Sequence, residues 1–333
     1  MSNSDPQAAQ ALVAEAEQAG PLLERVRAEI GKAVFGQERV VELTLAAILA
    51  GGHALLVGAP GLAKTKLVEA TAHVLGLDWA RVQFTPDLMP ADILGSEVLD
   101  QDEQGRRHFR FVKGPIFTQL LMADEINRAS PRTQSALLQA MQEHHVTVAG
   151  QAYDVPRPFH VLATQNPIEH EGAYPLPEAQ LDRFLLQVDV PYPDAEIERR
   201  ILIETTGVES AAPQRVLDAQ TLMRLQHVVR AMPVGEKVLA SILELVRSAR
   251  PGTSSDSRVN AHVAWGPGPR AGQALMLAAR ARALLRGRLT PAVDDVAALA
   301  RPALVHRMQL SFGARAEGLD IDTLVDELAE RAA

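Results

Sequence analysis

One stretch of the chain has the composition of a phosphate-binding loop: Gly58, Ala59, Pro60, Gly61, Leu62, Ala63, Lys64 and Thr65. It follows an apolar run that ends at Val57 and precedes a helical pattern that ends at Leu75. A glycine-containing turn between strand and helix directs backbone N–H groups and the positive end of the helix dipole into one cavity. Lys64 can place its ammonium on the β- and γ-phosphates of a nucleotide, and Thr65 can hold Mg²⁺ through its hydroxyl.

The loop departs from the usual pattern at Ala63, where a glycine normally precedes the lysine. Alanine avoids positive φ, so we expect Ala63 to have ordinary helical or bridge dihedral angles. We also assign Lys66, the residue after Thr65, to the nucleotide-binding stretch. The competing interpretation is a plain strand–loop–helix turn with a surface lysine.

Two adjacent carboxylates, Asp124 and Glu125, end a second apolar run. Here Asp124 can bind Mg²⁺, and Glu125 can accept the proton of an attacking water, as a nucleotide hydrolase requires. Taken alone, Asp-Glu is a common dipeptide in acidic loops. The phosphate-loop pattern upstream favours the catalytic interpretation.

Three further polar residues complete the candidate site. Asn166 follows the run Ala163-Thr164 and can hold the attacking water, although Asn-Pro is also a turn dipeptide. Arg183 precedes the last apolar run, and Arg270 begins a helical pattern after Gly-Pro-Gly-Pro. The permanently charged fork of arginine suits a developing phosphate oxyanion, but either arginine alone also fits a surface ion pair.

The elements that must position these residues alternate between strand and helix. Helical patterns separate most of the candidate buried strands, so we predict an α/β fold with a parallel five-stranded sheet. The predicted strands are Ala54–Val57, Trp79–Phe84, Gln119–Ala123, His160–Thr164 and Phe184–Val188. Helices are expected over Glu38–Ala50 and from Ser130-Pro131, where serine caps and proline fits the first turn.

Two inserted β-hairpins are predicted within this alternation. The first joins Glu97–Leu99 to Phe109–Val112, and the second joins Val146–Gly150 to Tyr153–Val155. Both show approximate period-2 alternation around a glycine-containing turn.

The N-terminal segment, from about Pro6 to Gly31, is predicted as two helices broken at Gly20-Pro21. After about Tyr192 the strand signals stop, and Pro251–Pro269 is predicted as a loop. The six C-terminal helices are predicted over Asp194–Thr205, Ala219–Ala231, Glu236–Ala249, Arg270–Arg286, Ala292–Gln309 and Asp320–Ala332.

These elements indicate three parts of the chain. They are N-terminal helices over 1–33, an α/β nucleotide-binding domain over 34–208, and an all-α lid domain over 209–333. We place the domain boundary near Val208–Pro213.

The bulk composition sets limits on partners and location. The 333 residues carry 33 Lys plus Arg against 41 Asp plus Glu, for a net charge of −8. These dispersed charges do not favour a nucleic-acid partner. There is no cysteine, which excludes disulfides and thiolate metal sites. No signal-peptide or transmembrane pattern is found, so a cytoplasmic protein is expected.

These five motifs, in this order over about Val34 to Ala329, resemble those of the AAA+ ATPases. The particular residues within them resemble the MoxR family. The matching stretches are GAPGLAKT, ADEINRASPRTQSALLQAMQE, ATQNPIE-EGAYPLPEAQLDRF, GPGPRA and ARALLRGR. In that family an alanine before the lysine is normal.

The resemblance assigns a role to each candidate residue. It implies that Lys64 and Thr65 belong to Walker A, and that Asp124 and Glu125 form Walker B. Asn166 resembles sensor 1. Arg183 resembles the arginine finger, which reaches the ATP of a neighbouring subunit, and Arg270 resembles sensor 2, which reaches the γ-phosphate from the lid. The adenine-facing segment corresponds to Val34, Phe35, Gly36 and Gln37.

The resemblance further implies an ATPase that uses ATP and Mg²⁺ and assembles as a ring, with a hexamer as the expected form. Its expected role is chaperone-like remodelling of a client protein or insertion of a metal cofactor, together with a partner that contains a von Willebrand factor A domain. Two alternatives remain open: a DNA-associated motor, which the acidic pI of 5.7 disfavours, and a nucleotide-gated scaffold with slow turnover.

Overall fold

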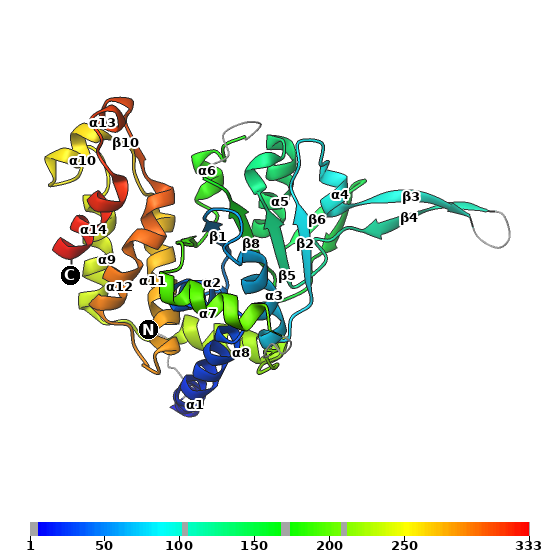
Figure 1. Cartoon of the computed structure of the whole chain (residues 1–333), viewed down its shortest axis with the longest axis horizontal. Coiled ribbons are helices and arrows are strands. Elements are labelled where there is room, and N and C mark those ends of the chain that lie inside the picture. Colours follow the sequence, from blue (N-terminus) through cyan, green and yellow to red (C-terminus); the bar gives the residue numbers. More distant parts are fainter. Residues whose placement is uncertain (1–5, 102–105, 168–173, 208–211, 333) are drawn as a thin grey trace.

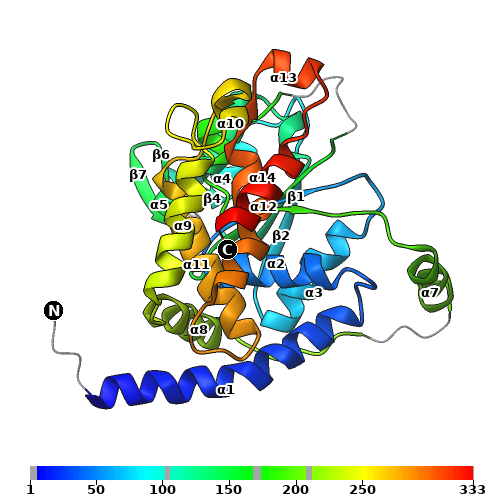
Figure 2. The same ribbon diagram turned by 90° about the vertical axis from the view of Figure 1, so that its left-hand side faces the viewer.

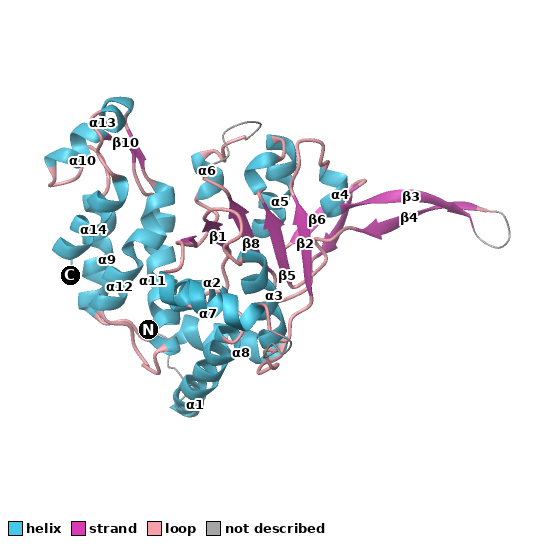
Figure 3. Ribbon diagram, viewed as in Figure 1, coloured by secondary structure: helices cyan, strands magenta, loops and turns pink. Residues whose placement is uncertain are grey.

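The structure, a computed structural model, describes residues 6–101, 106–167, 174–207 and 212–332, with side chains from residue 13 onward. Helices gather at one end, a sheet flanked by helices lies in the middle, and a long hairpin extends from the other end (Figures 1 and 3).

Five parallel strands form the central sheet, in the order β2–β5–β8–β1–β9. In that order they span Trp79–Gln83, Leu120–Asp124, His160–Gln165, Ala54–Val57 and Leu186–Asp189. Ala54, at the start of β1, pairs with Leu162 on one side and Leu186 on the other. Every residue of β5 is buried, as expected for a central parallel strand covered on both faces. The predicted five-stranded α/β sheet is therefore confirmed.

The last strand begins at Leu186 rather than at Phe184 as predicted. The backbone N–H groups of Arg183 and Phe184 donate to the carbonyls of Gln180 and Leu181. These two residues therefore prolong the turn of helix α6 (Glu178–Leu181) instead of pairing in the sheet.

The helices beside the sheet follow the sequence patterns closely. Helix α2 spans Glu38–Leu49, α3 spans Lys64–Leu75 and α5 spans Pro131–Glu143. The Ser130 hydroxyl accepts the backbone N–H of Thr133, so the predicted cap of α5 is present.

The N-terminal segment is one helix, α1 (Pro6–Gly31), and the predicted break at Gly20-Pro21 is wrong. Leu23, Val26 and Ile30 are fully buried beyond Pro21. Packing of this apolar stripe compensates for the backbone hydrogen bond that proline removes from the helix. A Cβ at Gly20 would lie 3.3 Å from the Cα of Gly287, so glycine permits close approach here. Figure 2 shows α1 running along the base of the molecule.

Both predicted hairpins are present, as β3 (Gly95–Gln101) with β4 (Arg107–Lys113) and β6 (His145–Val148) with β7 (Gln151–Asp154). The β3–β4 hairpin extends away from the body (Figure 1). Near its base, the ring of Phe111 stacks on Tyr153 of β7 with 4.1 Å between ring centroids. The two hairpins therefore contact each other.

The predicted C-terminal helices are present, several with shifted ends. They are α7 (Ala195–Thr205), α8 (Ala219–Ala231), α9 (Glu236–Ser248), α11 (Pro269–Leu285), α12 (Val293–Leu304) and α14 (Ile321–Ala332). Helix α7 has no buried residue and stands apart from the body (Figure 2). Helix α8 contacts α1 and α2 as well as α11, so it touches both the N-terminal helices and the C-terminal helical region.

Two expectations for this region are wrong. The predicted loop contains helix α10 (Ser257–His262) and strand β10 (Val263–Trp265), which pairs with β11 (Gln309–Leu310). The helix predicted to reach Gln309 ends at Leu304 and continues as a 3₁₀ turn, η2 (Val305–Arg307), followed later by a short helix, α13 (Phe312–Ala316). Strands of two or three residues are too short to show alternation, so the sequence carries no signal for them.

Candidate nucleotide-binding site

The phosphate-binding loop lies between the end of β1 and the start of α3, as predicted. A Cβ at Gly58 would lie 2.7 Å from the carbonyl oxygen of Val190, so only glycine fits there. The Lys64 ammonium donates to the carbonyl oxygens of Gly58 at 2.9 Å and of Ala59 at 2.7 Å. Burial lowers the pKa of Lys64, and the charges of Asp124 and Glu125 partly oppose that shift. The lysine therefore lies over the loop, where a phosphate group would meet it.

Ala63 has φ 56° and ψ 21°, in the left-handed region, so the expectation of ordinary dihedral angles is wrong. The chain must reverse here to begin α3, and the small, exposed side chain keeps the cost of this conformation to about 1–2 kcal/mol. Lys66, which was assigned to the same stretch, is exposed and lies 3.4 Å from Glu69. The described contacts do not direct Lys66 toward the loop.

The two carboxylates at the end of β5 are organised by Thr164 on the neighbouring strand β8. The Thr164 hydroxyl donates to Asp124 Oδ1 at 2.6 Å and accepts the backbone N–H of Glu125 at 2.8 Å. Glu125 has a positive φ of 55°, which turns the chain sharply after Asp124. Sequence reasoning did not identify Thr164, because the contact depends on β5 and β8 being neighbours.

The edge strand β2 supplies further partners for these acids. Arg81 donates to Asp124 Oδ2 through Nε at 3.1 Å and Nη2 at 2.5 Å. Gln83 donates to Glu125 Oε2 at 2.8 Å, and Arg128 donates to the same oxygen at 2.9 Å. Arg81 and Gln83 stand two positions apart on β2 and so share one face. The alternation of these polar residues along β2 was a sequence signal for this face of the strand, and the sequence analysis did not use it.

Asn166 lies directly after β8 and is buried. The preceding residue, Gln165, accepts the backbone N–H of Gly58 at 3.2 Å, which ties this strand end to the phosphate-binding loop. The structure therefore brings Asn166, the loop and the two carboxylates to one edge of the sheet, where the parallel strands end. Ligands bind at this edge in open α/β sheets.

The segment predicted to face adenine lies beside the same loop. Gln37 donates through Nε2 to the carbonyl of Leu62 at 3.3 Å. Its other polar atom, Oε1, is buried and accepts no hydrogen bond from the described residues. Arg200 of α7 lies over the ring of Phe35, with 4.8 Å from Cζ to the ring centroid. Val34 is buried and lines a hollow of about 340 Å³ between α1 and α2.

Arg183 and Arg270 lie together at the opposite edge of the sheet, where the strands begin. The N–H of Leu185 donates to the carbonyl of His53, next to the start of β1. Arg270 Nη1 lies 3.7 Å from Asp182 Oδ2, and the buried Arg307 donates to Asp182 Oδ1 at 2.7 Å. The four residues of β1 separate the two edges by about 13 Å.

Arg270 joins helix α11 to Asp182, in the segment before β9. Burial, and then the charge of Arg270, lower the pKa of Arg183. Arg183 Nε is buried and has no hydrogen-bond acceptor among the described residues. Arg183 thus lies close enough to Arg270 to sense its charge, at the edge of the sheet away from Lys64.

The donor set fits a nucleotide with Mg²⁺. Asp124 and Thr65 offer the hard oxygen ligands that Mg²⁺ prefers. The guanidinium of Arg81 already occupies Asp124 Oδ2, which shows that this carboxylate attracts a cation. Lys64 lies on loop carbonyls that a phosphate can replace as its partner.

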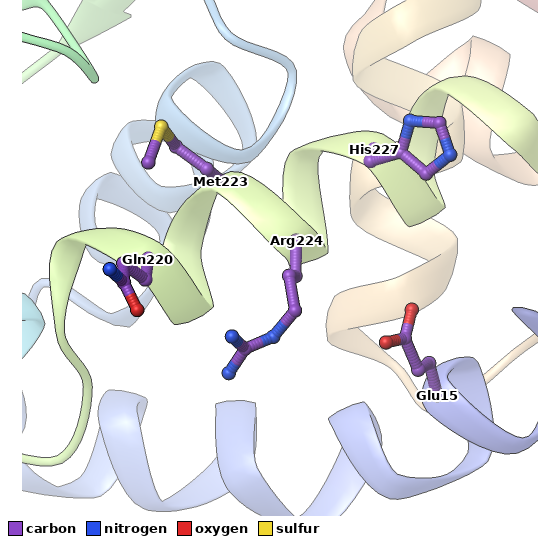
Figure 4. A pocket seen from close by; sticks show the side chains of 5 residues that line it. All are labelled: Glu15, Gln220, Met223, Arg224 and His227. Carbon is purple, nitrogen blue, oxygen red and sulfur yellow. The ribbon is translucent and has the colours of Figure 1, made fainter.

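A separate hollow of about 420 Å³ lies between α1 and α8 (Figure 4). It is lined by Glu15, Gln220, Met223, Arg224 and His227. Figure 4 shows Arg224 extending from α8 toward α1. None of these residues belongs to the predicted nucleotide site.

Comparison with known proteins agrees with this geometry. The profile of the family described as "ATPase family associated with various cellular activities (AAA)" matches residues 53–186, and an "AAA lid domain" profile matches residues 255–328. A solved crystal structure of a protein from Cytophaga hutchinsonii has a TM-score of 0.89 and 34% sequence identity. That match covers 97% of this chain and 98% of the other.

Two curated relatives carry the MoxR name. "Chaperone MoxR1" from Mycobacterium tuberculosis is 40% identical over 329 residues, which cover 98% of this chain and 85% of that protein. "Protein MoxR" from Methylorubrum extorquens is 33% identical over 307 residues, which cover 86% of this chain and 87% of that protein. Across the described ranges, no helix is long and apolar enough to cross a membrane. The nucleotide-site geometry, the AAA and lid profiles and these near full-length relatives show that the chain belongs to the MoxR family of AAA+ ATPases.

Proposed function

We propose that ATP is hydrolysed at the sheet edge formed by the phosphate-binding loop, Asp124, Glu125 and Asn166. Lys64 binds the β- and γ-phosphates, and Asn166 with Glu125 orients the attacking water. Glu125 accepts the proton of that water. The observation that carries this proposal is the Thr164 hydroxyl, which holds Asp124 and the Glu125 backbone at 2.6 and 2.8 Å.

The metal expected at this site is Mg²⁺, held by the Thr65 hydroxyl and the Asp124 carboxylate. Bound Mg²⁺ supplies charge neutralisation at the phosphate oxygens. The adenine base is proposed to lie against Val34, Phe35 and Gln37. Gln37 supports this placement because its buried Oε1 has no hydrogen-bond donor among the described residues and can accept one from the base.

We place Arg183 and Arg270 at the ATP of a neighbouring subunit. Both lie at the edge of the sheet away from their own phosphate-binding loop, and the buried Nε of Arg183 needs an acceptor that a partner can provide. A ring, with a hexamer as the proposed form, would bring this edge of one subunit to the ATP of the next.

The biological role that we propose is chaperone-like remodelling of a client protein, or insertion of its metal cofactor, in the cytoplasm. The relative named "Chaperone MoxR1" supports the chaperone part. A partner with a von Willebrand factor A domain completes the proposal. The domains proposed to move against each other are 34–208 and 209–333, with the helical segment 1–33 beside them.

The β3–β4 hairpin is the proposed contact with the client. It extends away from the body and exposes Leu99 by 55% and Phe109 by 69%, on paired positions of one face. Exposed apolar side chains on a protruding element are typical of a surface that binds other proteins.

An aggregation assay with a denatured model client tests this role. Wild-type protein with ATP should suppress aggregation of a denatured model client, and the double variant Leu99→Ser, Phe109→Ser should lose that effect while keeping its basal ATPase rate. Phe312→Ser is the control, because Phe312 is 84% exposed but lies on the lid. Stimulation of ATP hydrolysis by DNA, with no effect on the client, would favour the DNA-motor alternative instead.

A further inference from the structure

The edge strand β2 places a positively charged side chain on the proposed Mg²⁺ ligand. Arg81 directs both Nε and Nη2 to a single oxygen, Asp124 Oδ2, at 3.1 and 2.5 Å. Its Nη2 also donates to Gln83 Oε1 at 2.9 Å. The other oxygen, Asp124 Oδ1, accepts the Thr164 hydroxyl. Both oxygens of this buried carboxylate are therefore engaged by protein donors.

Arginine and Mg²⁺ cannot share Oδ2 in this arrangement. Two N–H groups already converge on the oxygen, and a directly bound Mg²⁺ would have to lie about 2.0–2.1 Å from it within a near-octahedral set of ligands. A guanidinium does not lose its proton in a protein, so Arg81 cannot yield by deprotonation. It must move away for the metal to bind Oδ2 directly.

The surroundings permit that movement. The Arg81 side chain is 47% exposed, while that of Asp124 is 12% exposed. The arginine can therefore turn into solvent at little cost, whereas the carboxylate stays in place through Thr164 and the sheet. Ion pairs with one exposed partner are weak enough to be displaced by a divalent ion.

We propose that Arg81 is a tethered cation that competes with Mg²⁺ for Asp124 and thereby sets the Mg²⁺ concentration at which nucleotide binds tightly. This inference rests on the proposed metal site. Without nucleotide, Arg81 is the cation in direct contact with this buried carboxylate. With Mg²⁺ and nucleotide, the arginine is released from the carboxylate. Arg81 is thus a positioning residue that regulates loading of the site.

The test uses Arg81→Met, which removes the charge and the donors but keeps most of the side-chain length. Binding of a fluorescent ADP analogue to the full chain is measured against Mg²⁺ concentration, with EDTA as the metal-free baseline. The expected result is a Mg²⁺ midpoint about two- to fivefold lower than in the wild type, because a competing charge-assisted contact of a half-exposed arginine is lost. Arg110→Met is the matched control, since Arg110 is also exposed and also paired with an aspartate, Asp100, at 2.8 Å.

Two outcomes would overturn the inference. A Mg²⁺ midpoint in Arg81→Met equal to that of Arg110→Met would show that Arg81 does not compete, and a higher midpoint would show that it assists the metal. Asp124→Asn separates this failure from failure of the site itself. If Asp124→Asn keeps the wild-type Mg²⁺ midpoint, the proposed metal site is wrong. If it loses Mg²⁺ dependence while Arg81→Met behaves as the control, only the role of Arg81 is wrong.

Discussion

Thr164 and Asp124, on neighbouring strands, are joined by a 2.6 Å hydrogen bond from the Thr164 hydroxyl to Asp124 Oδ1. The same hydroxyl oxygen accepts the N–H of Glu125, which has a positive φ. One side chain therefore fixes the proposed metal ligand and the backbone of the proposed general base. This cross-strand contact makes Thr164 the positioning residue of the site.

Replacing Thr164 with valine should lower both the stability of the fold and the rate of hydrolysis. Thr164→Val leaves the N–H of Glu125 and one oxygen of Asp124 unpaired, so we expect a loss of about 1–3 kcal/mol in the free energy of unfolding. We also expect kcat to fall at least about tenfold, because Glu125 is no longer held in position to accept the proton of the attacking water. Thr164→Ser, which keeps the hydroxyl, should preserve kcat. A valine variant with wild-type kcat would show that Thr164 does not position the acids.

Chelation of divalent metal should stop hydrolysis. The proposed ligands, Thr65 and Asp124, are hard oxygen donors suited to Mg²⁺. EDTA should abolish phosphate release from ATP, and added Mg²⁺ should restore it. Hydrolysis that continues at the wild-type rate in excess EDTA would contradict the site assignment.

Two buried histidines should make the fold sensitive to acid. Burial lowers the pKa of His160 to about 4, and burial with the neighbouring charge of His160 lowers that of His53 to about 3. The unfolded chain takes up these protons near pH 6.5, and the folded chain does so only at lower pH. Stability is therefore complete above about pH 6.5 and falls as the pH decreases toward 4.

His160→Gln tests this expectation, because glutamine does not titrate. Between pH 6 and 4.5, the free energy of unfolding should fall less steeply in the variant, by about 1.4 kcal/mol per pH unit. Urea unfolding at several pH values gives the slope. Equal slopes in the two proteins would mean that folding does not lower the pKa of His160.

Arg183 is expected to act across a subunit interface. Arg183→Ala should bind ATP nearly normally but hydrolyse it about 10³-fold more slowly, by comparison with other arginine fingers. Mixing Arg183→Ala with Lys64→Ala should restore some turnover, because each variant supplies what the other lacks at a shared interface. Wild-type activity per subunit should also rise with protein concentration as rings form. Two variants that co-assemble yet stay inactive at every ratio would show that Arg183 does not act in trans.

The parts of this structure that local patterns specify were predictable. The phosphate-binding loop, the five strands of the sheet and both hairpins follow from turn residues and apolar runs within a few positions, although the edge strand β2 is mostly exposed rather than buried. Helix α1 was not predicted as a single element, because tertiary packing of Leu23 and Val26 overrides the local signal of Gly20-Pro21. Ala63 was misjudged because its left-handed conformation is imposed by the loop around it.

The partners within the site depend on which strands are neighbours. Arg81 meets Asp124 because β2 pairs with β5, in a register that places Gln83 opposite Asp124. Arg270 meets Asp182 through contacts between α11 and the segment before β9. The members of each pair are far apart in sequence, so spacing does not show that they meet, although the alternation of Arg81 and Gln83 along β2 indicates that these two residues share one face. Their residue types alone allowed only a general expectation of ion pairing.

The central claim is that Glu125 acts in hydrolysis and Lys64 in binding, and one paired measurement tests it most directly. Nucleotide affinity and kcat are determined for Glu125→Gln and Lys64→Ala, with the exposed Glu204→Gln as a control. The account predicts that Glu125→Gln binds ATP like the wild type but loses turnover by about 10²–10⁴-fold, because an amide cannot accept the proton of water. Lys64→Ala should lose binding itself. An equal loss of affinity in both variants, or undiminished turnover in Glu125→Gln, would contradict the account.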